Sequence, residues 1–427
     1  MAIVKLGRHI IAEFYGCDST TLSDRRKIQK FLVRAAEKAE LTIIKVDSHS
    51  FEPGATTFMI IGESHLAIHT WPEFGYASID IYVCYGRDPW PAFEELRRLL
   101  KPQDYVVNEI TRGMEIPERM ASATYGIVDT LAPAMYVTYV PRRVLYRKEG
   151  IQKIEVIEHE ILGRCLFLDG RLQVAEYDEF MYHEVLVHPV MFAHPDPRSI
   201  LIIGGGDGGA LREVLKHNTV ERVAVVEIDK SVIEFSRKYI PSVNRGAFDD
   251  ERVEYIFTDG REFVKREGDK FDVAIIDVTD PHSGLSIPIF TREFHMDLKR
   301  RMREGGIVSQ QAEDVYLYHT LHKVNFPSIY RTFESVYRYV RGGRCWVPSY
   351  SSEWAFTYGS DLIDPMNIDE EELKRRMKER EVETEYYTPE IHRALMTFPK
   401  FVQNQIRKYG EILHEKQPLV EEVEKSF

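Results

Sequence analysis

The sequence predicts an α/β protein in which a small α/β sandwich is fused to a β-hairpin domain and a doubly wound, mostly parallel sheet. Three observations carry this prediction. The chain has 427 residues, which is too long for one ordinary hydrophobic core. In the first 115 residues, strand-like runs of alternating polarity surround two segments of helical period. From residue 198 onward, apolar strand-like runs alternate with helical segments, as they do in doubly wound sheets.

Residues 1–115 form a βαββαβ-like set. We expect the first helix to be capped by Ser23, and the second to have Asp88 at its cap and Pro89 in its first turn. The expected order is 8–16 (strand), 23–39 (helix), 41–51, 56–63 and 77–84 (strands), 88–100 (helix) and 104–110 (strand).

The remaining sequence divides where its periodicity changes. Residues 116–135 collect Pro, Ala and Gly and are expected to be a linker. Residues 136–195 carry short strand-like runs with Gly-bearing turns, which predict an antiparallel β domain. Residues 196–365 are expected to form the doubly wound sheet. Residues 366–427 are expected to be helical, with one helix starting at Thr388-Pro389-Glu390.

The composition is that of a globular protein, with 44% hydrophobic and 29% charged residues and a net charge of −12. Most of the negative charge follows residue 115, which disfavours nucleic acid as a partner of that part. The sequence has no apolar run near the ~20 residues of a membrane helix and no secretory-signal pattern. Its scattered cysteines lack metal-ligand or disulfide spacing, so we expect a cytoplasmic protein without a metal.

The stretch GGGDGG, residues 204–209, satisfies the glycine pattern that joins a strand to a nucleotide-binding helix, and Glu227 ends the next strand. This glycine pattern is commonest in dehydrogenases that bind NAD. Asp207 argues against them, because a carboxylate in this turn would repel a pyrophosphate. An acid at this position favours a ligand that has no phosphate and carries positive charge.

Three further acids follow strands of the same part, namely Asp259, Asp277 and Asp280. Ligands of doubly wound sheets bind at these carboxyl ends. Each acid alone is equally well a cap or turn residue. Together they predict a pocket for a positively charged nucleoside and a second cation.

From about residue 136 onward the chain resembles spermidine synthase, the polyamine aminopropyltransferase family, which has a small β domain followed by a Rossmann-like domain of the class I methyltransferase type. The matching stretches are EYDEFMYHEVLVHP, ILIIGGGDGGALREVLKH, VVEID, FTDGREF, DVTDP, IFTREF, QQAED and PSYSSEWAF. The resemblance implies transfer of an aminopropyl group from decarboxylated S-adenosylmethionine to an amine, with release of methylthioadenosine.

The resemblance also implies roles for individual residues. Asp207 would hold the amino end of the aminopropyl group, Glu227 the ribose hydroxyls and Asp259 the adenine. Asp277 would be the general base, because a protonated amine has no lone pair with which to attack. The residues that would contact the donor or the accepting amine are Gln152, Gln173, Tyr182, His183, Asp280, Gln311 and Tyr350.

One departure concerns the acceptor. After DVTDP the family has a Gly-Pro-Ala-like turn, whereas this chain carries HSGLSIP at 282–288. That segment lies over the acceptor site in the family, so the departure leaves the identity of the accepted amine open. Putrescine is the first candidate, and related amines are the alternatives. A methyltransferase activity also stays open, because that fold is shared.

The stretch GESHLAIHTWPE, residues 62–73, places Ser64 near two histidines and first suggests a serine hydrolase. It lacks the Gly-x-Ser-x-Gly elbow and the helix expected after such a serine, so we set that class aside. By themselves Ser64, His65 and His69 are better interpreted as ordinary strand and turn residues.

The surrounding stretches resemble bacterial-type S-adenosylmethionine decarboxylase over residues 1 to about 115. They are LGRHIIAEFYGC, HSFEPGATTFMII, GESHLAIHTWPEFGYASIDIYVC and DPWPAFEELRRLL. In that family the Glu-Ser bond, here Glu63–Ser64, cleaves itself, and the serine becomes a pyruvoyl group. The pyruvoyl carbonyl forms a Schiff base with the substrate and is the electron sink for decarboxylation.

The same resemblance implies that His69 drives processing and that Cys84 returns a proton to the substrate. The family's second processing serine is Thr56 here, whose extra methyl group leads us to expect slower processing. The residues that would flank the adenine or bind the ribose are Phe51, Trp71 and Glu73.

Together the two resemblances imply a bifunctional enzyme of polyamine biosynthesis, whose first part makes the donor that the second part consumes. An arginine or ornithine decarboxylase and an inactive regulatory module stay open for the first part, although Glu73 and the aromatic pair favour the nucleoside. Both families oligomerise, and the decarboxylase sites lie between protomers, so the resemblance implies a homodimer or homotetramer. The expected partners are small molecules, and neither nucleic acid nor a membrane.

Overall fold

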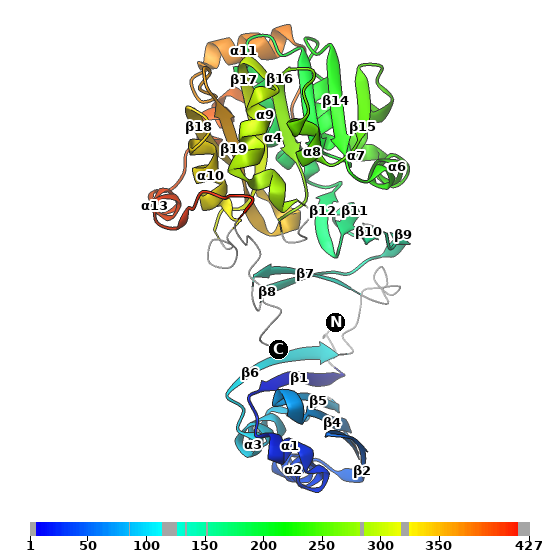
Figure 1. Cartoon of the computed structure of the whole chain (residues 1–427). Helices are drawn as coiled ribbons and strands as arrows, with labels where there is room; N and C mark the ends of the chain where they lie inside the picture. Colours follow the sequence, from blue (N-terminus) through cyan, green and yellow to red (C-terminus); the bar gives the residue numbers. More distant parts are fainter. Residues whose placement is uncertain are drawn as a thin grey trace. The chain divides into compact units, whose positions relative to one another are not determined.

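The computed structural model describes residues 6–84, 86–112, 126–132, 135–150, 153–281, 286–316 and 324–416. The chain forms two compact units. Unit 1 comprises Met1–Ala121 and Glu424–Phe427, and unit 2 comprises Ser122–Val423. In Figure 1 the strands and helices of unit 1 are blue to cyan, and those of unit 2 run from teal to red.

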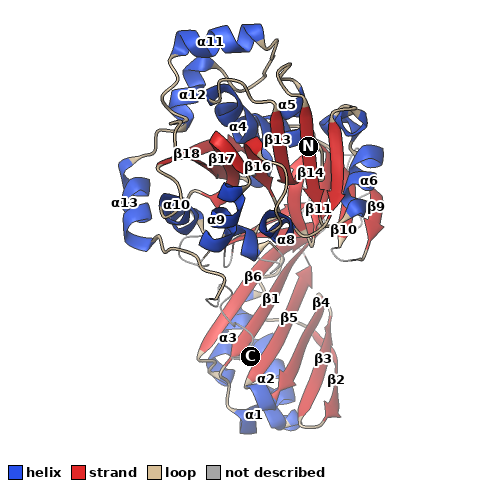
Figure 2. Cartoon of the chain, turned by 45° about the horizontal axis from the view of Figure 1, so that its top comes forward, coloured by secondary structure: helices blue, strands red, loops and turns tan. Residues whose placement is uncertain are grey.

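Unit 1 is an antiparallel sheet of strand order β2-β3-β4-β5-β1-β6 with its helices on one face (Figure 2). The expected α/β sandwich is confirmed. Its elements are β1 (Gly7–Tyr15), α1 (Ser19–Ser23), α2 (Arg25–Lys38), β2 (Ile43–Phe51), β3 (Gly54–Ile61), β4 (Ser64–Trp71), β5 (Tyr76–Cys84), α3 (Trp90–Leu100) and β6 (Asp104–Arg112).

Two details of unit 1 differ from the predictions. The cap of α2 is Asp24, whose carboxylate accepts a hydrogen bond from the backbone N–H of Lys27, whereas Ser23 ends α1. The segment Ser64–Trp71, to which we assigned no strand, is β4 in the middle of the sheet. Its turn-like flanks and two histidines concealed an alternation in which Leu66 and Ile68 are buried.

Among the described residues of unit 1, the helices lie on one face of the sheet, and we call the opposite face the open face. Alternate residues such as Leu66 and Ile68 pack into the core with α2 and α3, and their neighbours on each strand point the other way. Large apolar side chains on the open face are each 42% to 46% exposed: Phe58, Ile60, Val106 and Ile110.

Unit 2 is built on a seven-stranded sheet of order β15-β14-β13-β16-β17-β19-β18, in which the first five strands are parallel and β19 is antiparallel to both neighbours. The strands are β13 (Ser199–Gly204), β14 (Arg222–Glu227), β15 (Val253–Phe257), β16 (Phe271–Asp277), β17 (Met302–Asp314), β18 (Tyr339–Val347) and β19 (Ser352–Ser360). The helices are α4 (Glu179–Ala193), α5 (Gly209–Leu215), α6 (Lys230–Tyr239), α7 (Pro241–Asn244), α8 (Gly260–Lys265), α9 (Arg292–Arg300), α10 (Phe326–Glu334), α11 (Glu370–Glu379), α12 (Pro389–Leu395) and α13 (Lys400–Tyr409).

Helices cover both faces of this sheet (Figure 1), as the alternation of strands and helices predicts. Ile200 and Ile202 of β13 join a core with α4 and α5, while Leu201 and Ile203 join a core with α8 and α9. The doubly wound fold class is therefore confirmed.

The rest of unit 2 is antiparallel. A four-stranded sheet contains β9 (Arg143–Lys148), β10 (Ile154–His159), β11 (Gly163–Leu168) and β12 (Arg171–Ala175), and a hairpin contains β7 (Ile127–Ala132) and β8 (Met135–Tyr139). Strand β7 lies in the segment that we expected to be linker. Helix α4 lies in the segment that we expected to be β domain, and it packs on the seven-stranded sheet. Its sequence is mostly apolar and its polar residues do not gather on one side, so it gives no helical period.

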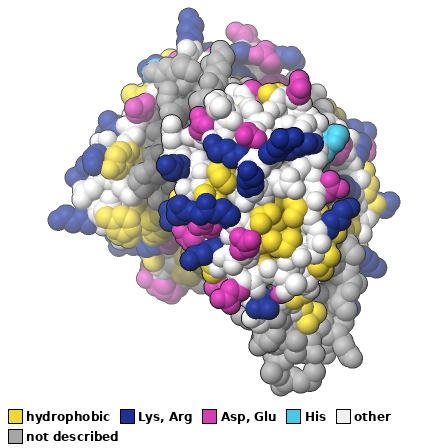
Figure 3. Space-filling model, turned by 90° about the horizontal axis from the view of Figure 1, so that it is seen from below, with side chains coloured by type: hydrophobic (Ala, Val, Ile, Leu, Met, Phe, Trp, Pro, Cys, Tyr) yellow, Lys and Arg dark blue, Asp and Glu magenta, His cyan; other side chains and the backbone are white. Residues whose placement is uncertain are grey.

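Charges are mixed over the surface. On the face drawn in Figure 3, Lys and Arg side chains lie among Asp and Glu, with small hydrophobic patches between them. Among the helices of the described residues, none is both long and apolar enough to cross a membrane.

Candidate functional site

The carboxyl ends of the parallel strands in unit 2 meet at one pocket. At the end of β13, Gly204 has a φ of 81°, and a Cβ added there would lie 2.1 Å from the carbonyl oxygen of Asp277. Only glycine permits this approach. The turn thereby brings Asp207, at the entry to α5, close to Asp277 at the end of β16.

Most of the predicted residues of unit 2 line this pocket, namely Gln173, Tyr182, Asp207, Glu227, Asp259, Asp277, Asp280, Gln311 and Tyr350. His183 is buried behind Asp207, and Gln152 lies outside the described residues. The sequence reasoning missed the apolar wall, which includes Leu168, Leu172 and Trp354. Trp354 lies within PSYSSEWAF, where an indole near acids was a usable signal.

Asp277 has the environment of a base. The hydroxyl of Tyr182 donates a hydrogen bond of 2.7 Å to its Oδ1. Its Oδ2 is buried and has no hydrogen-bond partner among the described residues. Burial raises the pKa of Asp277 to about 6, and the nearby carboxylate of Asp207 adds to this rise. A carboxylate with such a pKa can take a proton from a ligand near neutral pH.

Asp207 lies beside a buried cation. Nε2 of His183 is 3.4 Å from Oδ1 of Asp207, and Nδ1 is 2.7 Å from Oε2 of Glu179. Burial alone would lower the pKa of His183, but the two carboxylates outweigh it and raise that pKa well above its usual value. Burial would likewise raise the pKa of Asp207, yet the charge of His183 lowers it. Asp207 therefore remains a carboxylate, suited to a ligand's ammonium group.

The same charges decide whether the pocket suits a metal. Potential ligand atoms of His183, Asp207 and Asp277 lie within 4.8 Å of one another. A protonated imidazole carries a hydrogen on each nitrogen and has no lone pair for a metal. The cluster thus favours an organic cation over a metal ion.

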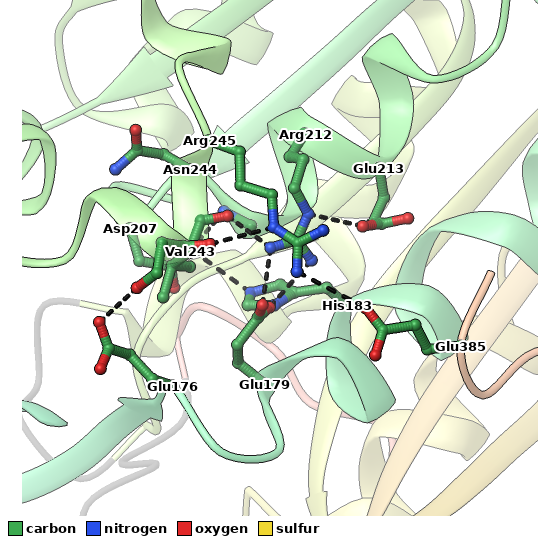
Figure 4. A network of polar contacts seen from close by, with 12 residues as sticks. Glu176, Glu179, His183, Asp207, Arg212, Glu213, Val243, Asn244, Arg245 and Glu385 are labelled. Carbon is green, nitrogen blue, oxygen red and sulfur yellow. Dashed lines mark hydrogen bonds and ion pairs between the residues drawn. The ribbon is translucent and has the colours of Figure 1, made fainter. Parts of the chain in front are cut away.

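A buried network extends from His183 between α4 and α5 (Figure 4). Arg212 donates to both carboxylate oxygens of Glu179 at 2.6 and 2.9 Å, and to Glu213 at 2.6 Å. Glu213 in turn lies 2.9 Å from Nε2 of His188. The sequence reasoning missed this network. The signal was a pair of ionisable residues, Glu179 and His183, four apart on a helix that is mostly apolar.

Other pocket residues have structural contacts of their own. Glu227 ends β14, and burial raises its pKa to about 7. Asp259 caps α8 through the N–H of Arg261 at 2.6 Å. The side-chain amide of Gln311 donates to the carbonyl of Val278 at 3.0 Å. The hydroxyl of Tyr350 donates to the carbonyl of Gln173. These bonds hold the lining in place.

In unit 1, the bond between Glu63 and Ser64 lies in the turn between β3 and β4. Ser64 has a φ of 144°, a conformation that residues other than glycine rarely adopt. The carbonyl oxygen of Glu63 accepts a hydrogen bond of 2.8 Å from the N–H of Cys84. The carboxylate of Glu63 accepts from the N–H and hydroxyl of Thr42 at 2.9 and 3.0 Å. The acyl side of this strained bond is therefore fixed.

A second group of predicted residues gathers at the other end of β4. Nδ1 of His69 is 2.8 Å from the hydroxyl of Thr56. The ring of Trp71 is centred 6.1 Å from that of Phe51 and 6.2 Å from that of His69. Glu73 follows in the helical turn Pro72–Phe74, where it is exposed.

The two groups of unit 1 do not meet. Ser64 and His69 are five residues apart on one strand, a span of about 16 Å. Cys84 is exposed at the end of β5, beside Ser64, because Ser64 pairs with Val83. The chain therefore presents two groups of predicted residues at opposite ends of the strand pair, one of Glu63, Ser64 and Cys84 and the other of Phe51, Thr56, His69, Trp71 and Glu73.

Unit 2 thus has a Rossmann-like fold, and its pocket places the carboxyl groups of Asp207 and Asp277 side by side. Residues 179–368 match the family model of the spermine/spermidine synthase domain, and residues 8–113 match that of S-adenosylmethionine decarboxylase. The polyamine aminopropyltransferase of Caldicellulosiruptor bescii is 38% identical over 290 residues, which are 67% of this chain and 100% of that protein. That of Korarchaeum cryptofilum is 41% identical over 253 residues, 59% of this chain and 77% of that protein.

Comparison with solved structures identifies the same family. A spermidine synthase in complex with the transition-state analogue AdoDATO superposes with a TM-score of 0.62 at 36% identity, covering 66% of this chain and 95% of the other. The spermidine synthase of Thermotoga maritima gives 0.60 at 35% identity, with the same coverage. The chain belongs to the polyamine aminopropyltransferase family, and it is a fusion of an S-adenosylmethionine decarboxylase domain with that enzyme. Membership decides against the methyltransferase alternative.

Proposed function

We propose that unit 1 decarboxylates S-adenosylmethionine through a pyruvoyl group formed from Ser64, and that unit 2 transfers the aminopropyl group of the product to putrescine. The products are then spermidine and methylthioadenosine. The observation that carries the proposal is the pair of carboxyl groups in one pocket. Asp207 is kept charged by His183, and Asp277 has a pKa of about 6.

In unit 2, Asp207 binds the ammonium group of the aminopropyl chain, Glu227 binds the ribose and Asp259 the adenine. Asp277 accepts a proton from the attacking amine. The nitrogen lone pair then attacks the methylene carbon next to the sulfonium, so that a carbon–nitrogen bond forms and the carbon–sulfur bond breaks. Methylthioadenosine leaves uncharged and needs no acid. Residues assigned to the amine side of the pocket are Tyr182, Asp280, Gln311 and Tyr350.

In unit 1, the pyruvoyl group supplies the electron sink for decarboxylation. The local residues suit its formation, since Ser64 follows a fixed and strained peptide. Cys84 holds the proton that the α-carbon receives, the rings of Phe51 and Trp71 flank the adenine, and Glu73 binds the ribose.

We further propose a homodimer in which the Ser64 end of one protomer meets the His69 end of its partner. Two features support it. His69 lies about 16 Å from Ser64 within a protomer, and the open face carries the exposed apolar residues Phe58 and Ile60. An antiparallel pairing of two open faces would complete two equivalent sites.

The test supplies the purified chain with S-adenosylmethionine and putrescine and identifies the products by mass spectrometry. We expect carbon dioxide, spermidine and methylthioadenosine. Parallel reactions with agmatine and spermidine define the acceptor. Carbon dioxide from arginine or ornithine, with none from S-adenosylmethionine, would overturn the assignment of unit 1. A processed chain that forms no aminopropylated product would overturn that of unit 2.

A further inference from the structure

The residue after Ser64 has its imidazole beside the Ser64 hydroxyl. Nδ1 of His65 is 3.2 Å from Oγ of Ser64, and Nε2 is 3.1 Å from Oδ1 of Asp80 on the neighbouring strand. The ring of Phe58 stacks on that of His65, with 5.3 Å between centroids and 19° between planes. Contacts from two strands thus fix the orientation of this imidazole.

The hydrogen bonds also assign its protons. A carboxylate oxygen only accepts, so Nε2 of His65 carries a hydrogen, and in the neutral imidazole with that tautomer the lone pair of Nδ1 faces the hydroxyl of Ser64. The same oxygen of Asp80, Oδ1, also lies 2.8 Å from Nε2 of His9. Nδ1 of His9 accepts from Arg112 at 2.9 Å, so His9 also presents an N–H to Asp80.

We propose that His65 is the general base, and then the general acid, of the first step in the cleavage of the Glu63–Ser64 bond. The proposal rests on the proposed function of unit 1 and assigns the step for which His69 is too distant. It names His65 as a catalytic residue and Asp80 as a positioning residue that holds its tautomer.

The step balances within the chain. Nδ1 of His65 takes the hydroxyl proton of Ser64, and Oγ attacks the carbonyl carbon of Glu63. The carbon–nitrogen bond between the two residues then breaks, and His65 returns the proton to the departing nitrogen. The result is an ester between the acyl group of Glu63 and Oγ of Ser64, with a free amino group on Ser64.

One hydrogen bond and one strained backbone torsion angle also favour this step. Negative charge develops on the carbonyl oxygen of Glu63, which already accepts the N–H of Cys84 at 2.8 Å. Breaking the peptide also releases the φ of 144° imposed on Ser64. Every group involved belongs to one protomer, whereas the later elimination at Ser64 awaits His69 of a second protomer.

The experiment follows conversion of the full chain to its two fragments on denaturing gels, with and without hydroxylamine, which cleaves esters but not peptides. We expect His65→Ala and His65→Gln to slow conversion about 100-fold or more, the usual contribution of a general base. Neither variant should yield hydroxylamine-dependent fragments, because the ester does not form. Added imidazole should partly restore conversion of His65→Ala, and Asp80→Asn should slow conversion less than His65→Ala.

Two comparisons make the result specific. His69→Ala should stop after the ester, so that hydroxylamine cleaves it. Tyr82→Phe, which removes only a hydroxyl from a ring 5.8 Å from that of His65, should convert at the parent rate. Aminopropyl transfer by the same preparations, with decarboxylated S-adenosylmethionine supplied, shows that unit 2 is folded, and recovery of conversion with imidazole shows that unit 1 of His65→Ala is folded.

Conversion of His65→Ala at the parent rate, or accumulation of its ester, would overturn the role of His65. Failure of the unaltered chain to convert at all would instead overturn the proposed function of unit 1. Slow conversion of His65→Ala that imidazole does not improve would also count against base catalysis.

Discussion

The two units assemble their candidate sites in opposite ways. In unit 2, residues from the ends of β13, β14 and β16 converge on a single pocket, with Asp207 and Asp277 facing the same space. In unit 1, the matching residues lie at the two ends of β4, about 16 Å apart. The pocket of the parallel sheet is assembled within one chain, whereas the antiparallel sheet keeps its two groups of predicted residues apart.

The difference follows from sheet geometry. The carboxyl ends of parallel strands all lie at one edge of the sheet, so the fold alone brings together acids that follow successive strands. In an antiparallel sheet, residues at the two ends of one strand remain far apart within the chain. They can share a site only if a second protein surface packs against the sheet. The open face of unit 1 offers that surface.

Replacing Ser64 with Ala should have the largest effect. Without the hydroxyl no ester forms, so the chain should stay uncleaved and release no carbon dioxide from S-adenosylmethionine. Aminopropyl transfer in unit 2 should be unchanged when decarboxylated S-adenosylmethionine is supplied. Denaturing gels and the two separate assays check this. Residual cleavage would show that another residue is the nucleophile.

Replacing Asp277 with Asn removes the base of unit 2. We expect kcat for aminopropyl transfer to fall about 100-fold to 10,000-fold, with little change in decarboxylation by the same preparation. Rapid-quench measurement of methylthioadenosine checks it, and unit 1 is the internal control. A fall of less than tenfold would remove Asp277 from the proton transfer.

Co-expression of Ser64→Ala with His69→Ala chains tests the half-sites. A mixed dimer joins an intact Ser64 end from one chain to an intact His69 end from the other. Decarboxylation should recover from none to about a quarter of the parent activity, because half the dimers hold one complete site. Each variant expressed alone is the control. No recovery in verified mixed dimers would place both ends in one protomer.

The pH profile of unit 2 should report the buried carboxyl pair. Asp277 acts as a base only when deprotonated, and its pKa is raised to about 6, so kcat/KM should fall as the pH drops through about 6. The hydrogen bond from Tyr182 lowers this pKa, so Tyr182→Phe should move the acidic limb to higher pH. The limb belongs to the coupled pair of Asp207 and Asp277. An unmoved limb would show that another group controls it.

Replacing Thr56 with Ser should have the smallest effect. The hydroxyl that lies 2.8 Å from Nδ1 of His69 is kept and a methyl group is removed. We expect fragment formation to accelerate about two- to fivefold, because the freer hydroxyl rotates more readily toward the reacting bond. A time course after synthesis in a cell-free system checks it, and Thr57→Ser on the core side of β3 is the matched control.

Much of both units could be predicted from sequence, but for different reasons. The acids of unit 2 follow strands, and strand ends of a doubly wound sheet share an edge, so their meeting needed only the fold class. Strand β4 was missed because GESHLAIHTWPE mixes turn residues and histidines with its buried positions, and α4 was misplaced because it has no polar face.

The sequence by itself determined the two families, the order of their domains and the chemical types available: a serine after a glutamate, and acids at strand ends. The tertiary structure decided which of these groups carry a proton and which can touch. His183 is a cation only because Glu179 and Asp207 are buried against it, and His65 presents a lone pair to Ser64 only because Asp80 holds its other nitrogen. Protonation and contact depend on distances of a few ångströms between residues far apart in the chain, which local patterns do not encode.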